Sequence, residues 1–205
     1  YYNDYNFRDA KWHTLCIFLL LEEENSMERY VITIAREFGS LGRPIAKKMA
    51  ELLGIEFYDR DIVEVTAKNM NLPESLVGNM EEKSGGLGFM RFPLGKSDKD
   101  TQDKIFAEQT KVIQEVSDQE SCIIVGRCSD YILRNNKNCI KIFIYAPYEA
   151  RLKNCIDVLH MGREQAKKMI DQVDKAREGY HKKYAGFSQA DPRYKDIMID
   201  SSLLG

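Results

Sequence analysis

The sequence predicts a three-layer α/β domain, with a mostly parallel β-sheet and helices on both of its faces. Apolar, β-branched runs that are typical of buried strands recur at about 30–35, 55–58, 122–125, 140–145 and 197–199. Helical apolar periodicity separates these runs, at about 44–53, 60–70, 100–119, 147–160 and 163–183. Because each crossover helix covers one face of the sheet, this alternation favours parallel pairing of the strands.

The 205 residues suit one domain of this kind, which we expect to span residues 27–205. Residues 1–26 differ in composition: they are rich in Tyr and Asn, then apolar, then acidic. They are interpreted either as an N-terminal extension of uncertain role or as an extra element that packs on the domain. Two segments could form a mobile lid or cap, the glycine-bearing stretch at 81–99 and the charged stretch at about 160–190.

The overall composition excludes several classes of protein. The 30 basic and 32 acidic residues give a net charge of −2, so we expect no nucleic-acid partner. The five cysteines are odd in number and form no C-x-x-C pair, and the three histidines show no zinc spacing, so we expect free thiols in a reducing cytoplasm. The apolar run at 15–21 is too short to span a membrane. Composition leaves the oligomeric state open.

A glycine-bearing loop lies between the first predicted strand and the following helix. Gly39 and Gly42 allow the backbone to approach a ligand closely, and the helix N-terminus directs amide groups toward a bound phosphate. Arg36 and Arg43 could add charged hydrogen bonds to phosphate oxygens. The loop departs from the G-x-x-x-x-G-K-[ST] pattern, because Arg43 replaces the lysine and Pro44 the hydroxyl residue. A tight turn with two structural glycines is the alternative.

The wider sequence resembles the cytidylate kinase-like family, whose fold is that of the P-loop kinases. The opening stretch that carries the resemblance reads VITIAREFGSLGRPIAKKMAELLGIEFYDRDI, with the loop form R-x-[FY]-G-S-x-G-R. Further on, the sequence has the G-R segment and the next strand, SCIIVGRCSDYIL and CIKIFIYAPYEARL. The D-x-x-R helix and the closing strand follow, as DQVDKAREGYHKKY and YKDIMIDSSLLG. The resemblance covers about residues 29–205 and rests on the order of these motifs.

The resemblance implies roles for particular residues. The phosphates of the donor nucleotide would be held by Arg36, Gly39, Ser40, Gly42 and Arg43. The acceptor nucleotide would be bound by Asp59 and Arg127, and the catalytic group would comprise Arg43, Arg127, Asp174 and Arg177. Candidate lid cations are Arg151 and Arg163. The implied cofactors are ATP and Mg²⁺, and the metal ligands stay unassigned.

Simpler interpretations exist for several of these residues. Asp59 could cap the helix that follows it. Asp174 and Arg177 could form a surface ion pair on one helix, and Arg151 and Arg163 could be solvated helix residues. Two cysteines, Cys122 and Cys128, are better explained as buried apolar side chains than as nucleophiles.

Three functions are compatible with these patterns. The first is transfer of the γ-phosphoryl group of ATP to a nucleoside monophosphate such as CMP or dCMP. The second is a kinase for another small molecule, which the altered loop and the unfamiliar segment at 81–99 favour. The third is a module that binds a nucleotide or another anion without transferring phosphate, because the standard lysine and hydroxyl of the loop are absent.

Overall fold

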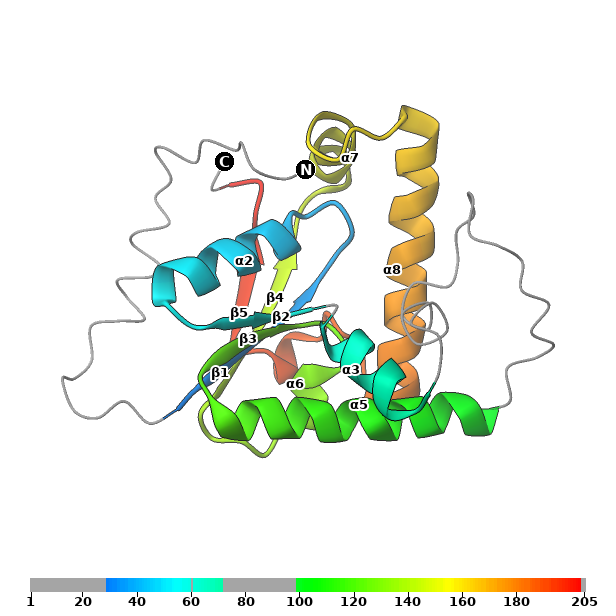
Figure 1. Cartoon of the computed structure of the whole chain (residues 1–205). Helices are drawn as coiled ribbons and strands as arrows, with labels where there is room; N and C mark the ends of the chain where they lie inside the picture. The colour runs from blue at the N-terminus through cyan, green and yellow to red at the C-terminus, as the bar shows by residue number, and fades with distance from the viewer. Residues whose placement is uncertain (1–28, 60, 72–98, 204–205) are drawn as a thin grey trace.

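The structure is a computed structural model, which describes residues 29–59, 61–71 and 99–203 (Figure 1). The expected extension at 1–26 and almost all of the segment at 81–99 lie outside the described residues. A lid in that segment therefore stays a prediction.

Five strands form one sheet, and every pair of neighbouring strands is parallel. They are β1 (Val31–Arg36), β2 (Glu56–Tyr58), β3 (Cys122–Val125), β4 (Cys139–Tyr145) and β5 (Ile197–Asp200). Their order across the sheet is β2-β3-β1-β4-β5, which places the first strand in the middle. The predicted parallel sheet is confirmed. Every residue of β1 and β3 is buried, as expected for strands covered on both faces.

Helices cover both faces of the sheet (Figure 1). One face packs on α2 (Gly42–Leu53), in a core that includes Ile32, Ile34 and Ile45. The other face packs on α3 (Asp61–Asn69), α5 (Lys99–Gln119) and the short α6 (Ser129–Ile132). Alternate residues of β1 serve these two cores, because successive side chains of a strand point to opposite faces. No helix in the described part of the chain is long and apolar enough to cross a membrane.

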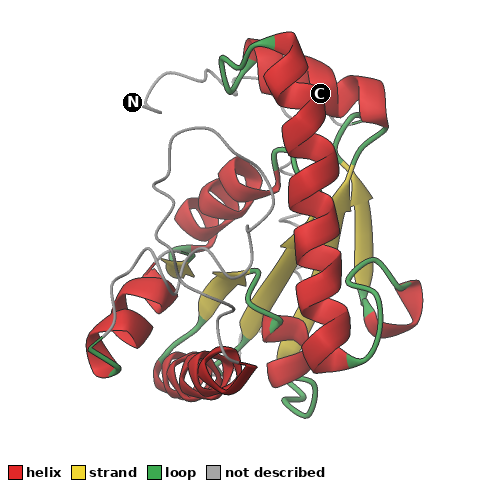
Figure 2. Ribbon diagram, turned by 90° about the vertical axis from the view of Figure 1, so that its right-hand side faces the viewer, coloured by secondary structure: helices red, strands yellow, loops and turns green. Residues whose placement is uncertain are grey.

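Two further helices, α7 (Tyr148–Asp157) and α8 (Arg163–Ala185), pack on each other beside the loop that follows β1. Their shared apolar cluster includes Leu152, Cys155 and Ile170, and Phe38 from that loop packs against it. Figure 2 shows α8 running along the front of the sheet. The carboxyl end of β1 is therefore bordered by α7 and α8 as well as by α2.

The observed helices and strands differ from the expected ones mainly at their ends. The helix expected from Pro44 begins two residues earlier, at Gly42. Pro44 still lies in the first turn of the helix, where proline is tolerated. The short helix α6 and a 3₁₀ turn, η1 (Pro192–Tyr194), were not predicted. Four residues of α6 and three of η1 are too few to show a helical period.

The described cysteines are free, as expected, and all are buried: Cys122, Cys128, Cys139 and Cys155. Burial raises the pKa of the Cys122 thiol to about 12. That thiol is therefore neutral near pH 7 and serves as an apolar side chain rather than a nucleophile.

The backbone at Gly39 approaches α7 closely. A Cβ atom at this position would lie 2.9 Å from the carbonyl oxygen of Arg151 and 2.9 Å from Sγ of Cys155. The side-chain amide of Asn154 donates a 2.9 Å hydrogen bond to the Gly39 carbonyl. Gly39 also has a φ of +79°, in the left-handed region that side chains disfavour. Both the conformation and the space at this position require glycine.

We expect Gly39→Ala to lower the free energy of unfolding by about 3 kcal/mol, the sum of backbone strain and overpacking. The matched control is Gly54→Ala. Gly54 has a φ of +64°, but a Cβ there would meet no atom within 4 Å. This control should cost only about 1 kcal/mol, because it adds strain without a clash. Urea denaturation measures both values, and equal losses in the two variants would contradict the close approach of α7.

Candidate functional site

The glycine loop, residues 37–41, turns the backbone from β1 into α2. Gly39 and Leu41 both have left-handed backbone conformations, with φ of 79° and 59°. Leu41 is the N-cap residue of α2 and makes no side-chain cap. The first amides of a helix have no partner within the helix and carry partial positive charge. An uncapped helix N-terminus behind a glycine loop is suited to binding a phosphate group.

The hydroxyl of Ser40 is used inside the loop. Ser40 is fully buried, and Oγ lies 2.9 Å from the Glu37 carbonyl oxygen and 3.2 Å from the Ile144 carbonyl oxygen. A hydroxyl has one proton, so it donates to one of these acceptors at a time. Ser201 in turn donates a 2.8 Å hydrogen bond to the Ser40 carbonyl. The side chain of Ser40 thus shapes the loop.

Charged residues of α7 and α8 bind the glycine loop through hydrogen bonds and ion pairs. Asp174 Oδ1 accepts a 2.7 Å hydrogen bond from the Phe38 amide, and Arg151 donates to the Phe38 carbonyl oxygen at 3.3 Å. Arg151 also pairs with Asp174 and, at 3.3 Å, with Glu37. Burial raises the pKa of Glu37, against the opposing effects of the Ala146 amide and Arg151. Asp174 and Arg151, predicted as catalytic and lid residues, therefore contact the loop itself.

Three buried arginines gather where β1 and β3 end. Arg36 is the last residue of β1, and Arg127 occupies the corresponding place after β3, because the register pairs Ile34 with Val125. Arg177 reaches them from α8 and donates a 3.2 Å hydrogen bond to the Arg36 carbonyl. Arg36, Arg127 and Arg177 are only 5–6% exposed. Buried arginines at this edge of the sheet suit an anion, because a guanidinium group keeps its charge when buried and its planar fork matches phosphate oxygens.

Arg127 lies in a strained turn. Gly126, Arg127 and Cys128 are consecutive residues with positive φ, at 78°, 59° and 53°. For the two residues that carry side chains, this conformation costs roughly 1–3 kcal/mol each. Such strain persists only where surrounding contacts enforce it, and it occurs often at ligand sites. The turn lies at the carboxyl edge of the sheet, where open parallel sheets bind ligands.

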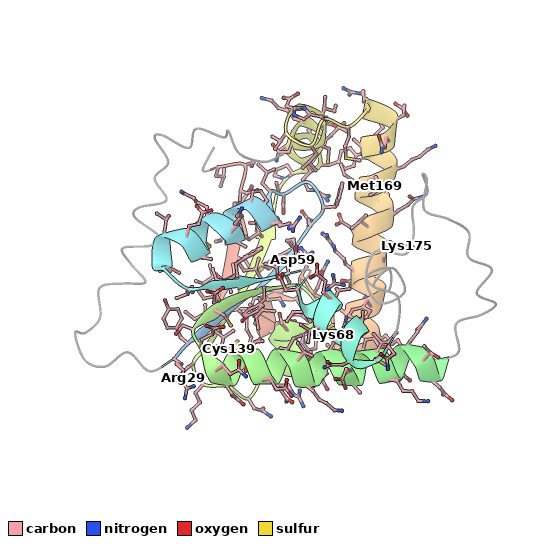
Figure 3. The ribbon with its side chains drawn as sticks, in the orientation of Figure 1. Arg29, Asp59, Lys68, Cys139, Met169 and Lys175 are labelled. Atoms are coloured by element: carbon pink, nitrogen blue, oxygen red, sulfur yellow. The ribbon has the colours of Figure 1, made fainter. Side chains whose placement is uncertain are left out.

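Arg43 and Asp59 form an ion pair in this structure. Arg43 Nε, on the first turn of α2, lies 2.6 Å from Oδ2 of Asp59, which follows β2 (Figure 3). The Asp59 side chain is 7% exposed, whereas that of Arg43 is 49% exposed. The structure therefore brings together a predicted donor-phosphate residue and a predicted acceptor residue.

The remaining candidates are placed as follows. Gly42 contacts Arg36, since a Cβ on Gly42 would lie 2.7 Å from the Arg36 Cβ. Arg163, the second lid candidate, is exposed at the first residue of α8. Within the described ranges no three His, Cys, Asp or Glu residues are placed to hold a metal ion.

A buried ionic cluster next to the arginines was not anticipated from the sequence. Asp130 on α6 contacts His181 on α8 and Lys195, which follows η1. A cavity of about 10 Å³, room for roughly one water molecule, lies beside it. The cavity is lined by Ala35, Gly126, Cys128, Ser129, Asp130, Arg177, Tyr180, His181 and Gln189. The sequence offered one signal for this cluster, which was the spacing of its residues from the predicted arginines. Asp130 lies three residues after Arg127, and His181 lies four residues after Arg177.

The cluster makes folding stability depend on pH in the acid range. Burial alone would raise the pKa of Asp130, but the His181 hydrogen bond and the Lys195 charge outweigh it and lower the pKa to about 2. The depressed pKa means that the ionised carboxylate stabilises the fold above pH about 4, and that this stability is lost as pH falls toward 2. The contribution is about 2 kcal/mol.

We therefore expect the stability difference between wild type and Asp130→Asn to narrow by about 2 kcal/mol between pH 5 and pH 2. Urea denaturation across this range measures it. Glu115 provides a control, because it is an exposed carboxylate on α5. Glu115→Gln should leave the pH dependence close to that of wild type. A constant difference between wild type and Asp130→Asn would show that folding leaves the pKa of Asp130 at its ordinary value.

Similar proteins agree with this architecture. An uncharacterized protein from Eubacterium ventriosum is 27% identical in sequence, with a TM-score of 0.64. The match covers 85% of this chain and 92% of that one. Shikimate kinase from Bacteroides thetaiotaomicron is 11% identical with a TM-score of 0.50, over 84% of this chain and 86% of the other. At this identity the likeness concerns the fold alone, and it confirms the expected P-loop-kinase-like arrangement.

The sequence comparison is more specific. No curated protein matches the sequence. Residues 31–203, which include every candidate site residue, match the sequence profile of one family. This chain therefore belongs to the cytidylate kinase-like family.

Proposed function

We propose that this protein transfers the γ-phosphoryl group of ATP to a nucleoside monophosphate, with CMP or dCMP as the preferred acceptor. The observation that carries the proposal is that Arg36, Arg127 and Arg177, all at least nine-tenths buried, lie at the edge of the sheet from which the glycine loop leaves. Phosphoryl transfer depends mainly on positioning two substrates and neutralising charge on the transferred group. A phosphate-binding loop next to a set of guanidinium groups meets both requirements.

The donor would bind at the glycine loop. The free amides at the start of α2 would hold its phosphates, and Arg43 would leave Asp59 to contact them. Mg²⁺, when bound, would neutralise part of the charge of the donor phosphates.

The acceptor would place its phosphate against Arg127, with Asp59 facing the rest of the nucleotide. A phosphate acceptor fits this site better than a sugar hydroxyl does. The second pKa of a phosphate monoester is about 6, so the attacking oxygen is already deprotonated at pH 7. No general base is then needed, and cations that hold the acceptor dianion near the donor are sufficient. Buried arginines supply such cations.

The bond changes follow from this arrangement. An acceptor phosphate oxygen forms the new bond to the γ-phosphorus, the bond from that phosphorus to the β–γ bridging oxygen breaks, and the oxygen leaves with ADP. The donor Mg²⁺ and the arginines would offset the charge that develops. Asp174 and Arg151 would keep the glycine loop in its binding conformation through their bonds to Phe38. Arg177 would act beside Arg127, and Arg163 would close over the donor as a lid cation.

A second candidate is a module that binds a nucleotide without turnover. The observation in its favour is the 2.6 Å ion pair between Arg43 and Asp59, which occupies the cation of the loop. Pro44, in addition, stands where a hydroxyl usually helps to hold magnesium. Such a protein would bind ATP and release no ADP.

The first experiment measures ADP release from ATP and Mg²⁺ with CMP, dCMP, UMP, AMP or GMP as acceptor, together with ATP binding by calorimetry. We expect release with CMP or dCMP at least tenfold above that with the purine nucleotides. Release with none of the five from folded protein that binds ATP would favour the binding module. Release that appears only with an acceptor outside the panel, such as a sugar or a hydroxy acid, would indicate a kinase of another small molecule.

The Arg127 side chain is tested by Arg127→Asn. Asn tolerates positive φ better than most residues, so this substitution removes the charge without adding backbone strain. We expect kcat/KM for the acceptor to fall about 100-fold, or about 2.7 kcal/mol, with ATP binding unchanged. Arg134→Ala is the matched control, because Arg134 is an exposed arginine that lies over the Tyr131 ring. Full activity in Arg127→Asn would exclude the assigned role.

A further inference from the structure

The buried cluster of Asp130, His181 and Lys195 joins three parts of the fold. The side chains of Asp130 and His181 are 5% exposed, and that of Lys195 is completely buried. His181 Nε2 lies 3.1 and 3.0 Å from the two carboxylate oxygens of Asp130, and Lys195 Nζ contacts Oδ2. The carboxylate is thus fixed between His181 on α8 and the Lys195 ammonium group next to β5.

Contacts at both ring nitrogens fix the orientation of His181. Nδ1 lies 2.9 Å from the Phe187 carbonyl oxygen, and Nε2 faces the Asp130 carboxylate. Asp130, His181 and Arg177 line the same small cavity. The cluster therefore lies next to the arginine site.

The cluster is adjacent to the strained turn at 126–128. Asp130 lies on the first turn of α6, two residues after Cys128. Inside the turn, the Ser129 amide donates a 3.1 Å hydrogen bond to the Gly126 carbonyl. If the turn relaxed to negative φ, α6 would shift and pull the Asp130 carboxylate away from His181 and from the buried Lys195 ammonium group. Because a buried charge without its partner is costly, this displacement is strongly opposed.

We propose that Asp130 is a positioning residue: held by His181 and Lys195, it keeps the turn at 126–128 left-handed and thereby holds Arg127 in its anion-binding place. The part of this inference that concerns anion binding rests on the proposed function, whereas the part that concerns the backbone does not. The rival interpretation is a simple structural contact between α8 and α6. That contact would affect stability and leave the conformation of Arg127 unchanged.

The test uses two variants of the full-length chain. Asp130→Asn removes the carboxylate charge, and Lys195→Met removes the buried ammonium group while keeping the contact between Asp130 and His181. The matched control is Glu178→Gln. Glu178 also lies on α8, pairs with Lys182 at 3.0 Å and accepts a 3.0 Å hydrogen bond from Ser188, but these contacts do not involve α6.

Two measurements are made on each folded variant. Crystal structures give the φ angles of Arg127 and Cys128, and NMR titration with inorganic phosphate follows the amide signals of Arg127 and of residues 41–43. We expect Arg127 to lose its positive φ in Asp130→Asn. Phosphate affinity should fall at least tenfold at Arg127 and less than twofold at residues 41–43. Lys195→Met should change the φ angle and the phosphate affinity of Arg127 in the same direction as Asp130→Asn does. Glu178→Gln should match wild type in both measurements.

The outcomes separate this proposal from the proposed function. Positive φ retained at Arg127 in folded Asp130→Asn overturns the positioning role, and if that variant does not fold, Lys195→Met decides by the same criterion. Equal weakening of phosphate binding at Arg127 and at residues 41–43 also overturns the positioning role, because that result indicates a general loosening of the fold. If phosphate does not bind at Arg127 in wild type, the proposed role of Arg127 fails, and the φ angles alone decide whether Asp130 positions the turn.

Discussion

Parallel pairing of β1 with β3 is the constraint on which the arrangement of the candidate site depends. The register that places Ile34 beside Val125 also places the chain positions of Arg36 and Arg127 side by side at one edge of the sheet. The glycine loop leaves the same edge at the end of β1. A shift of one residue in this register would turn the buried isoleucines toward the wrong core, so the apolar packing that stabilises the sheet also fixes the position of the two arginines.

The glycine loop itself is held mostly by helices that come later in the chain. Gly39 lies against α7, and Phe38 exchanges hydrogen bonds with Asp174 and Arg151. A loop that α7 and α8 already hold in place loses little conformational freedom when an anion binds. Less of the binding free energy is therefore spent on ordering the loop. The residues that organise the loop are thus distinct from the amides that would contact the phosphate.

Local patterns in the sequence predicted the elements well and the side-chain partners poorly. The apolar, β-branched run of β1 and the glycine spacing after it indicated a strand, a loop and a helix, because these signals lie within a few residues of one another. The pairing of Asp130 with Lys195 joins residues 65 positions apart, which no local period can encode. Asp174 was expected in the catalytic group or in a surface ion pair, and its bond to Phe38 depends on how α8 crosses the end of β1. Long-range polar contacts of this kind depend on how whole helices and strands pack against one another.

One side of α8 carries three of the contacts described above. Asp174, Arg177 and His181 follow one another at intervals of three and four residues, so they share a face of the helix. They contact the glycine loop, the end of β1 and α6, respectively. At a rise of about 1.5 Å per residue, these points span roughly 10 Å of a single rigid rod. A rotation or slide of α8 would therefore displace its partners in the glycine loop, at the end of β1 and in the buried ionic cluster in a single movement.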